Sequence, residues 1–367
     1  SKAIFRPGRW FLINTLALAL VGFLLFVSAS LGLLSRDGAR FNVVATKQLI
    51  ILIVSLVVFF VFSRIDYRHW RRSSLWIFIG SIIFTLLVFV PGLGLTLNGA
   101  SRWISLGSLT VQPSEFLKLG FILYLAALLA HSRSANQTWQ AGLLPLVILF
   151  AIVSPIIIAE PDIDTLVIMF ISGLAMFFVA GAKWRHLVLI ALIALMAVAT
   201  VAYFKPYIRS RITTFLRPQE NTLGSSYQIN QSLIALGSGG IFGRGFGQSI
   251  QKFKYLPEPI GDSIFSVAGE EFGLIGTMII ILLFLGLSIF GLKIAATAPT
   301  SYGRLLSVGI VIMITVGAFI NITAMTGLIP LTGTPLLFVS HGGTSLLVAL
   351  IAAGIVLNVA RQTKKPS

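Results

Sequence analysis

The sequence contains no cysteine, and its 367 residues include only 11 Asp and Glu against 27 Lys and Arg. Without cysteine, the chain cannot form a disulfide, a thiolate zinc site or a cysteine nucleophile. Charged residues make up 10% of the chain and hydrophobic residues 56%, whereas a soluble domain is about 25% charged. The net charge of +16 could indicate nucleic acid as a partner, but basic residues commonly flank membrane helices. We therefore expect no nucleic-acid binding.

Long apolar runs recur along the whole chain and predict an all-α polytopic membrane protein, because about 20 apolar residues cross a bilayer as a helix. The first run has no small-residue cleavage site after it, so it is predicted as a retained helix and not a signal peptide. The last two spans come from one charge-free run that GLIPLTGTP divides, since its prolines and glycines disfavour a helix. We predict ten transmembrane helices, at about 11–33, 48–63, 75–95, 114–131, 142–159, 165–182, 186–204, 264–292, 305–327 and 338–360.

Lys and Arg gather in alternate connecting segments, of which the one holding Arg64 and Arg68 is an example. The positive-inside rule then predicts that both termini are cytoplasmic. In this orientation Asp66 is the one cytoplasmic carboxylate, and the other ten lie on the outer side or in the outer ends of helices. We therefore expect the polar chemistry at the outer face.

Residues 205–263 form a large extracytoplasmic loop between helices seven and eight. Long loops without transmembrane character are usually functional or disordered. Tyr, Phe, Ile and Leu are distributed throughout this one, so we expect it to fold onto the outer surface. We find no sequence repeat and treat 1–367 as a single integral membrane domain.

Four carboxylates lie close together at the start of the eighth span: Glu258, Asp262, Glu270 and Glu271. Asp262 is at the loop–helix junction, where it fits either an N-cap or a general base. Glu270 and Glu271 fall inside the helix, so at least one should face a cavity or a basic partner such as Lys118. Clustered carboxylates also suit a hard divalent cation, Mg²⁺ or Mn²⁺.

Three further motifs are rich in polar residues. In NGASRWISLGSLTVQPSEFLKLG, Pro113 predicts a helix start, and Glu115 and Lys118 form either an intrahelical ion pair or, as we favour, a polar cavity wall. Arg102 in the same motif lies beside a tryptophan, and a role as an anchor at the membrane interface suits it as well as a role in the polar site. EPDIDT predicts an acidic turn in which Asp162 or Asp164 caps the sixth helix.

The Gly-rich segment LGSGGIFGRGFGQ (236–248) matches neither a dinucleotide fingerprint nor a P-loop. It fits a tight-turning loop, or a backbone cradle for phosphate helped by Arg244, Lys252 and Lys254.

Together these motifs resemble the SEDS family (shape, elongation, division and sporulation proteins) over essentially the whole chain. The resemblance rests on NGASRWISLG…VQPSEFLKL, EPDIDT, YQINQSLIALGSGGIFGRGFGQSIQKFKYLPEPIGDSIF, GEEFGLIG and GLIPLTGTPLLFVSHGGTS. It implies a ten-span membrane glycosyltransferase that polymerises lipid II into peptidoglycan glycan strands. GRGFGQSIQKFKYLPEP is more similar to the division-type FtsW branch than to the elongation-type RodA branch.

The resemblance implies that Asp262, which follows LPE, is the catalytic carboxylate. Gly261 and Ser263 flank it where the family usually has Thr and Phe, Asp164 stands where Gly is usual, and His341 replaces Tyr in SHGGTS. The positions implied or suggested to bind substrate are Arg102, Glu115, Lys118, Arg244, Lys252, Lys254, Glu258, Glu271, Ser340 and His341.

The mechanism implied is attack by an acceptor sugar hydroxyl on a donor whose leaving group is polyprenyl pyrophosphate. Asp262 would take the proton, basic side chains would neutralise the pyrophosphate, and a divalent cation could share that work. The resemblance also implies lipid II and membrane lipid as ligands, a class B penicillin-binding protein and divisome proteins as partners, and the bacterial inner membrane as the location. A lipid II flippase, a RodA-like polymerase and a non-catalytic scaffold are the alternatives.

Overall fold

The computed structural model describes residues 6–34, 40–97, 100–107, 109–131, 142–217 and 225–363. Most of them are helical. In chain order the elements are α1 (Arg6–Ser30), η1 (Leu31–Leu33), α3 (Arg40–Phe62), α4 (Tyr67–Leu86), η2 (Leu87–Phe89), β1 (Gly94–Leu97), β2 (Ala100–Leu106), β3 (Leu109–Val111), α5 (Pro113–Leu129), α6 (Leu144–Ala159), α7 (Ile163–Val179), α8 (Trp184–Phe204), α9 (Pro206–Leu216), α10 (Ser225–Gly239), α11 (Gln251–Lys254), α12 (Ile264–Ala296), α13 (Ser301–Met325) and α14 (Gly343–Gln362).

A helix overlaps each of the ten predicted spans. Within the described part of the chain, seven helical stretches are long and apolar enough to cross a membrane, and α6 and α7 are shorter apolar helices. The chain is therefore a multi-pass membrane protein. The predicted start of the last span at residue 338 is wrong, because residues 326–342 form an irregular segment and α14 begins at Gly343.

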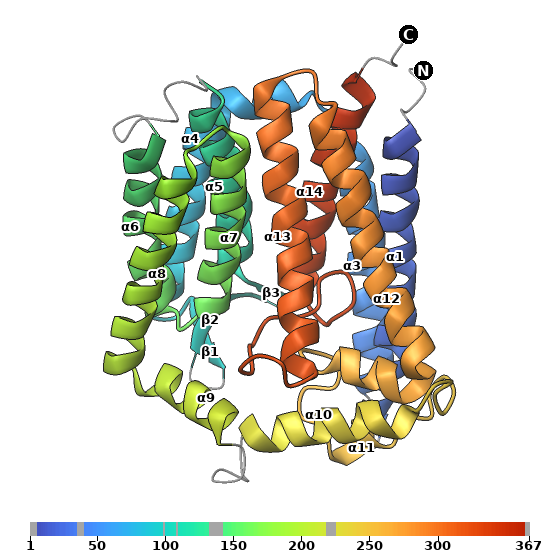
Figure 1. The fold of residues 1–367 in the computed structure, drawn as a ribbon. Coiled ribbons are helices and arrows are strands. Elements are labelled where there is room, and N and C mark those ends of the chain that lie inside the picture. Colours follow the sequence, from blue (N-terminus) through green and yellow to red (C-terminus); the bar gives the residue numbers. More distant parts are fainter. Residues whose placement is uncertain are drawn as a thin grey trace.

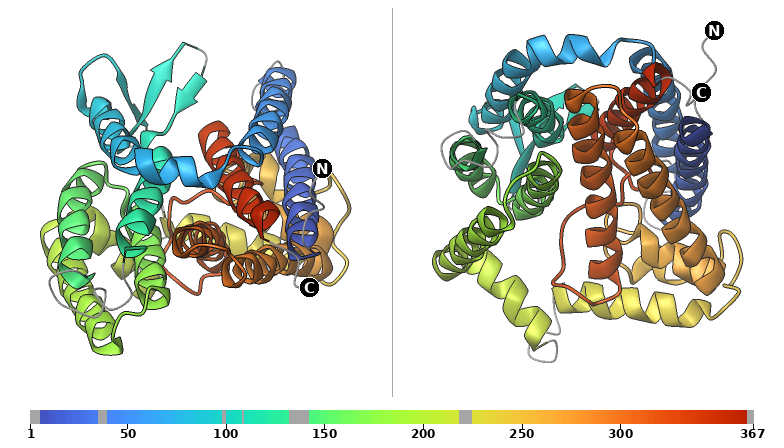
Figure 2. Two further views of the ribbon diagram at one scale, coloured as in Figure 1. Left: turned by 90° about the horizontal axis from the view of Figure 1, so that it is seen from above. Right: turned by 45° about the horizontal axis from the view of Figure 1, so that its top comes forward.

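The helices run up and down between two ends of the molecule, and the start of α1 lies at the same end as the close of α14 (Figure 1). The turn between α3 and α4 is also at that end, where Arg361 donates a hydrogen bond to the carbonyl of Ser63 (3.2 Å). Viewed from above, α4–α9 form one group and α1, α3 and α10–α14 another (Figure 2). α13 packs against α7 and α5 and so joins the two groups.

The connection between α4 and α5 contains an antiparallel sheet with strand order β1-β2-β3, which the sequence analysis did not predict. Ile104 is opposite Gly94 in β1 and Val111 in β3. Pro113 begins α5 directly after the sheet, as predicted. The sheet matters for the site because β2 carries Arg102.

The segment 205–263 contains three helices, α9, α10 and α11, which lie across the end opposite the termini (Figure 1). α10 packs against α12. The expected loop therefore has its own helical structure, which was missed because these helices are short and polar.

The Gly-rich segment docks into a break in α12 at Gly273, where φ is 64° and ψ is −160°. Only glycine adopts this conformation without strain. The backbone N–H groups of Arg244 and Gly245 donate to the carbonyls of Glu270 (3.0 Å) and Glu271 (2.9 Å), which lie just before the break. These backbone N–H groups bond to carbonyl groups of α12 and are not available to hold a phosphate. The phosphate-cradle alternative is therefore wrong for these two N–H groups.

Candidate active site

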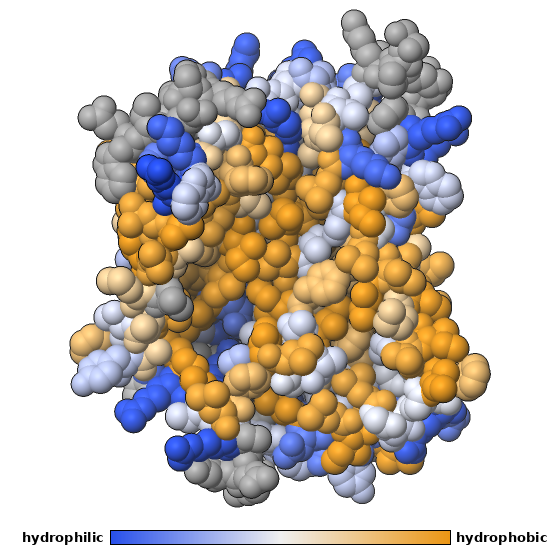
Figure 3. Space-filling view, viewed as in Figure 1, coloured by the Kyte–Doolittle hydropathy of each residue, from blue (hydrophilic) through white to orange (hydrophobic). Residues whose placement is uncertain are grey.

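A cavity of about 730 Å³ opens among the helix ends and loops of the end opposite the termini. In the space-filling view, hydrophilic side chains lie deep in a hollow between two apolar surfaces (Figure 3). The lining comes from β2, the α6–α7 turn, α9, the segment before α12 and the segment before α14. Its ionisable side chains among the described residues are Arg102, Lys205, Arg211, Glu258, Asp262 and His341.

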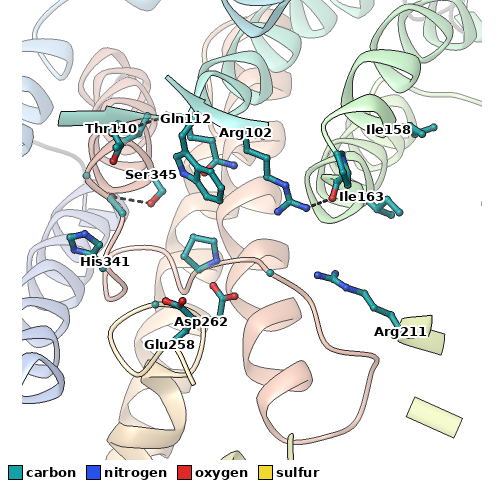
Figure 4. A pocket seen from close by; sticks show the side chains of 18 of the residues that line it. Arg102, Thr110, Gln112, Ile158, Ile163, Arg211, Glu258, Asp262, His341 and Ser345 are labelled. Atoms are coloured by element: carbon teal, nitrogen blue, oxygen red, sulfur yellow. Dashed lines mark hydrogen bonds between the residues drawn. The ribbon is translucent and has the colours of Figure 1, made fainter. Parts of the chain in front are cut away.

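Asp262 lies at the floor of this cavity, in the segment that leads into α12 (Figure 4). Ser263, not Asp262, occupies the N-cap position, so the capping alternative for Asp262 is wrong. The backbone carbonyl of Asp262 accepts a hydrogen bond from Asn321 of α13 (2.9 Å), which fixes the segment. The carboxylate of Asp262 lines the cavity.

Burial, together with the negative charges of Glu258 and Asp164, raises the pKa of Asp262 to about 7. The guanidinium groups of Arg211 and Arg102 oppose it. A carboxylate with a pKa near neutrality can both ionise and accept a proton at physiological pH, as a general base must.

Arg102, Arg211 and Asp262 converge around Gly333 (Figure 4). A Cβ atom built on Gly333 would lie 3.5 Å from Arg102 Nη1, 3.6 Å from Arg211 Nη2 and 3.9 Å from Asp262 Oδ2. Two guanidinium groups and one carboxylate therefore border the same small volume. This arrangement suits an anionic group that must lie next to a base.

Arg102 is held against the EPDIDT turn. Its Nε donates to the carbonyl of Glu160 (3.1 Å) and its Nη2 to the carbonyl of Pro161. Its Nη1 lies 3.8 Å from Asp162 Oδ1. Arg102 is buried except toward the cavity, so it is a wall residue of this site and not an interfacial anchor.

The EPDIDT turn is itself a polar network. Asp162 occupies the N-cap position of α7 but makes no side-chain capping hydrogen bond; its carboxylate instead accepts from the hydroxyl groups of Thr165 (2.9 Å) and Ser114 (3.2 Å). Asp164 Oδ2 accepts from the backbone N–H of Gly333 (3.0 Å). The turn therefore positions the arginine-bearing wall and the Gly333 segment together.

Glu160 in this turn is fully buried, and neither of its carboxylate oxygens has a hydrogen-bond partner among the described residues. Burial, with the charge of Asp162 adding to it and Arg102 opposing it, raises its pKa to about 8. The environment of Glu160 therefore favours the neutral acid at pH 7.

Ser340 and His341 border the segment that carries Asp262. Ser340 Oγ donates to the carbonyl of Gly261 (2.8 Å), and the backbone N–H of His341 donates to the carbonyl of Ile260 (2.6 Å). The imidazole lines the cavity and stacks on Phe26. Desolvation in the cavity wall and the nearby charge of Lys47 lower the pKa of His341, although part of its side chain is exposed.

Several of the predicted substrate-binding residues do not line the large cavity. Lys118 Nζ pairs with Glu115 Oε1 at 2.8 Å, and both side chains are buried within the bundle. Glu115 and Lys118 therefore form an intrahelical ion pair, and neither side chain is in the lining of this cavity.

Lys252, Glu271 and Arg244 are also placed away from the large cavity. Lys252 Nζ pairs with Glu271 Oε1 at 2.6 Å, and Arg244 Nε lies 3.6 Å from Glu270 Oε1. Glu270 and Glu271 thus have basic partners, as expected, but neither partner is Lys118. Lys254 is exposed on α11 and does not line the cavity either.

Arg211 and Lys205 line the cavity and were not among the predicted site residues. They lie far from Asp262 in sequence, in a segment that was treated only as a loop. Gln112 and Thr344 were also missed; the backbone N–H of Gln112 donates to Thr344 Oγ1 (3.2 Å) and joins the sheet to α14. The only feature of the sequence that could have indicated Arg211 and Lys205 was the presence of basic residues in the segment 205–263.

The described residues contain no group of three or more His, Asp or Glu side chains arranged to hold a metal ion. Glu258 and Asp262 share the cavity wall, and two carboxylates do not complete the shell of a hard cation. These side chains alone therefore do not form a resident metal site.

Comparison with known proteins gives a consistent family. A family model described as "Cell cycle protein", covering FtsW, RodA and SpoVE, matches residues 9–365. Stage V sporulation protein E of Bacillus subtilis (strain 168) is 39% identical over 358 residues, which are 98% of each chain. The probable peptidoglycan glycosyltransferase FtsW of Coxiella burnetii is 37% identical over 97% of this chain and 96% of its own.

Two solved structures share the fold. A chain from a structure described as "Structural coordination of polymerization and crosslinking by a peptidoglycan synthase complex" matches with a TM-score of 0.79 and 26% identity, over 97% of this chain and 98% of that one. The rod shape determining protein RodA of Thermus thermophilus matches with a TM-score of 0.69 and 25% identity, over 97% of both chains.

Proposed function

The chain belongs to the FtsW/RodA/SpoVE family, and from that premise we propose that it is a peptidoglycan glycosyltransferase that polymerises lipid II. The observation that carries the proposal is the convergence of Asp262 with Arg102 and Arg211 around Gly333 in one cavity. A base beside two guanidinium groups matches a reaction in which a hydroxyl loses a proton while a diphosphate departs.

In the proposed reaction, the acceptor sugar hydroxyl attacks the anomeric carbon of the donor. A glycosidic C–O bond forms, the bond between that carbon and the diphosphate oxygen breaks, and the hydroxyl proton passes to Asp262. Arg102 and Arg211 stabilise the negative charge that develops on the diphosphate, with Lys205 nearby on the same wall. Polyprenyl diphosphate is the leaving group.

Our proposal puts the cavity on the extracytoplasmic side of the bacterial inner membrane and both termini in the cytoplasm. The support is that Arg64, Arg68 and Arg361 lie at the end where α1 starts and α14 closes, as the positive-inside rule requires. The cavity lies at the opposite end. A flippase would instead need its charged groups near the midplane of the bilayer.

The same proposal gives the protein a role in cell division or sporulation, since FtsW and stage V sporulation protein E are among its relatives. It also includes a class B penicillin-binding protein as the partner that cross-links the product. The structural neighbour from a peptidoglycan synthase complex supports such an assembly. If a divalent cation takes part, phosphate oxygens of the substrate must complete its shell beside Asp262 or Glu258.

The decisive experiment gives lipid II, a divalent cation and a cognate class B transpeptidase to the purified protein and separates glycan polymers on a gel. We expect polymer from wild type and none from Asp262→Asn, which keeps the shape but removes the base. Asp66→Asn is the matched control, because Asp66 caps α4 at the other end of the molecule and Asn caps equally well. Equal polymer from Asp262→Asn would contradict the proposal.

A further inference from the structure

We propose that Asp164 is an internal counter-anion, which holds Arg211 until an anionic diphosphate enters the cavity and takes that guanidinium over. The inference rests on the proposed function, because it takes a lipid-linked diphosphate as the ligand. It concerns a carboxylate that the transfer reaction itself does not use.

The contacts of Asp164 join three elements at the cavity edge. Asp164 is in the first turn of α7, and its Oδ2 lies 3.5 Å from Nη1 of Arg211, which α9 carries. The same oxygen accepts the backbone N–H of Gly333, from the segment between α13 and α14 (3.0 Å). One carboxylate oxygen therefore connects the α4–α9 group of helices to the other group.

Among the described residues, the Arg211–Asp164 pair is more exposed than the Arg102–Asp162 pair at this site. The side chain of Arg211 is 25% exposed and that of Asp164 11%, whereas Arg102 and Asp162 are 7% and 5% exposed. Arg211 is the partly exposed member of this pair, whereas the Asp164 carboxylate is buried at the cavity edge. The Arg211 guanidinium is therefore more accessible to an anion in the cavity than that of Arg102.

A guanidinium group binds phosphate with the same planar fork that it offers to a carboxylate. A diphosphate carries more negative charge than Asp164, so it would win Arg211 when it lies next to Gly333. When the diphosphate leaves, Asp164 is in place to take the arginine back. Such an exchange keeps Arg211 positioned in the empty cavity and speeds release of the anionic product.

The exchange has a second consequence for Asp262, which faces the charges of Glu258, Asp164, Arg211 and Arg102. The charge of Asp164 makes Asp262 harder to ionise. Removing this charge should shift the acid limb of the pH–rate profile toward lower pH, which a purely structural role of Asp164 would not do.

The test measures binding of geranylgeranyl diphosphate to the purified full-length protein in detergent, with geranylgeraniol as the uncharged control. Asp164→Asn removes the charge but retains an oxygen that can accept the Gly333 N–H. We expect it to bind the diphosphate about fivefold more tightly than wild type. The gain should vanish in the Arg211→Gln background, and Asp66→Asn should bind like wild type.

Each outcome decides between the proposals. If wild type binds the diphosphate and Asp164→Asn binds it equally or more weakly, the counter-anion role is wrong while the proposed function stands. A gain that persists in the Arg211→Gln background also overturns it. If no variant prefers the diphosphate to the alcohol, the diphosphate site of the proposed function fails as well. Asp164→Ser, which is neutral and retains an acceptor, repeats the test should Asp164→Asn unfold.

Discussion

Lys252 Nζ lies 2.6 Å from Glu271 Oε1, and neither side chain is exposed to solvent. Ser28 of α1 completes the cluster by donating to Glu271 Oε2 (2.5 Å) and accepting the backbone N–H of Gly247 (3.1 Å). The cluster therefore joins α1, α11, α12 and the Gly-rich segment. Neither Lys252 nor Glu271 is in the lining of the large cavity.

Lys252→Met should destabilise the protein by about 3–5 kcal/mol, because it leaves the Glu271 carboxylate buried without its cation. The Lys252→Met/Glu271→Gln double variant should be more stable than the single variant, since no buried charge is then unpaired. Thermal unfolding in detergent measures both. Lys254→Met is the matched control on exposed surface and should unfold like wild type. Equal melting temperatures for all variants would show that the pair does not hold the fold.

The pH dependence of polymerisation should follow Asp262. As a general base it must be ionised, so the initial rate should rise with pH and reach half its plateau near pH 7. Glu258→Gln should move this midpoint to lower pH, because the charge of Glu258 raises the pKa of Asp262. The measurement is the initial rate at saturating lipid II from pH 5 to pH 9. A rate that does not change across pH 7 would exclude Asp262 as the titrating base.

Glu160 should make the stability of the protein depend on pH. The folded state keeps its proton up to about pH 8, whereas the unfolded state releases it near 4.5. The folded state therefore binds more protons between these values, and its stability falls as the pH rises from about 4.5 to about 8. Glu160→Gln should be as stable to unfolding as wild type at pH 4. At pH 8 its free energy of unfolding should be greater than that of wild type by roughly a few kcal/mol, as the size of the pKa shift implies. Melting temperatures at pH 4, 6 and 8 test this, and parallel curves would contradict it.

The sequence was informative where a single local rule decides the structure. Each predicted apolar run overlaps a helix, Pro113 located the start of α5, and the position after LPE located Asp262 at a loop–helix junction. Arg102, Glu258 and His341, whose motifs are polar segments between apolar runs, line the cavity, and their predicted role in substrate binding stays a prediction.

The sequence was uninformative where tertiary packing chooses the partner. Lys252 is close to Asp262 in sequence, yet it turns inward to Glu271, while Arg211 reaches the cavity from another helix. Periodicity cannot distinguish these two outcomes for a basic residue in a polar segment. The sheet was missed because its strands are short and follow directly on an apolar helix, so the apolar pattern continues into β1.

Gly273→Ala should destabilise the protein by at least about 2 kcal/mol. The backbone at Gly273 has a positive φ that side chains rarely adopt, and an added Cβ would overlap the backbone of Ile241 and Gly243. The Gly-rich segment would then leave the break in α12. Gly80→Ala is the control, because nothing lies near its Cβ on α4. Similar melting temperatures for both variants would mean that the docked segment adjusts without loss.

Gly333→Ala should separate activity from stability. An added Cβ would make ordinary contacts, 3.5 Å from Arg102 Nη1 and 3.6 Å from Arg211 Nη2, so the fold should tolerate it. The methyl group would nevertheless fill the volume between both guanidinium groups and Asp262, which the departing diphosphate needs. We expect polymerisation to fall at least about tenfold, equivalent to about 1.4 kcal/mol of transition-state stabilisation, with an unchanged melting temperature.

Gly237→Ala on α10 is the matched control for this variant, because nothing lies within 4 Å of its Cβ. The same gel assay and melting curves are measured for both proteins. Full activity of Gly333→Ala would place the diphosphate elsewhere in the cavity, since a methyl group in the proposed volume would then be harmless. Loss of activity with a lowered melting temperature would instead assign Gly333 to the fold. Only loss of activity in a stable protein agrees with a reacting centre bordered by Arg102, Arg211 and Asp262.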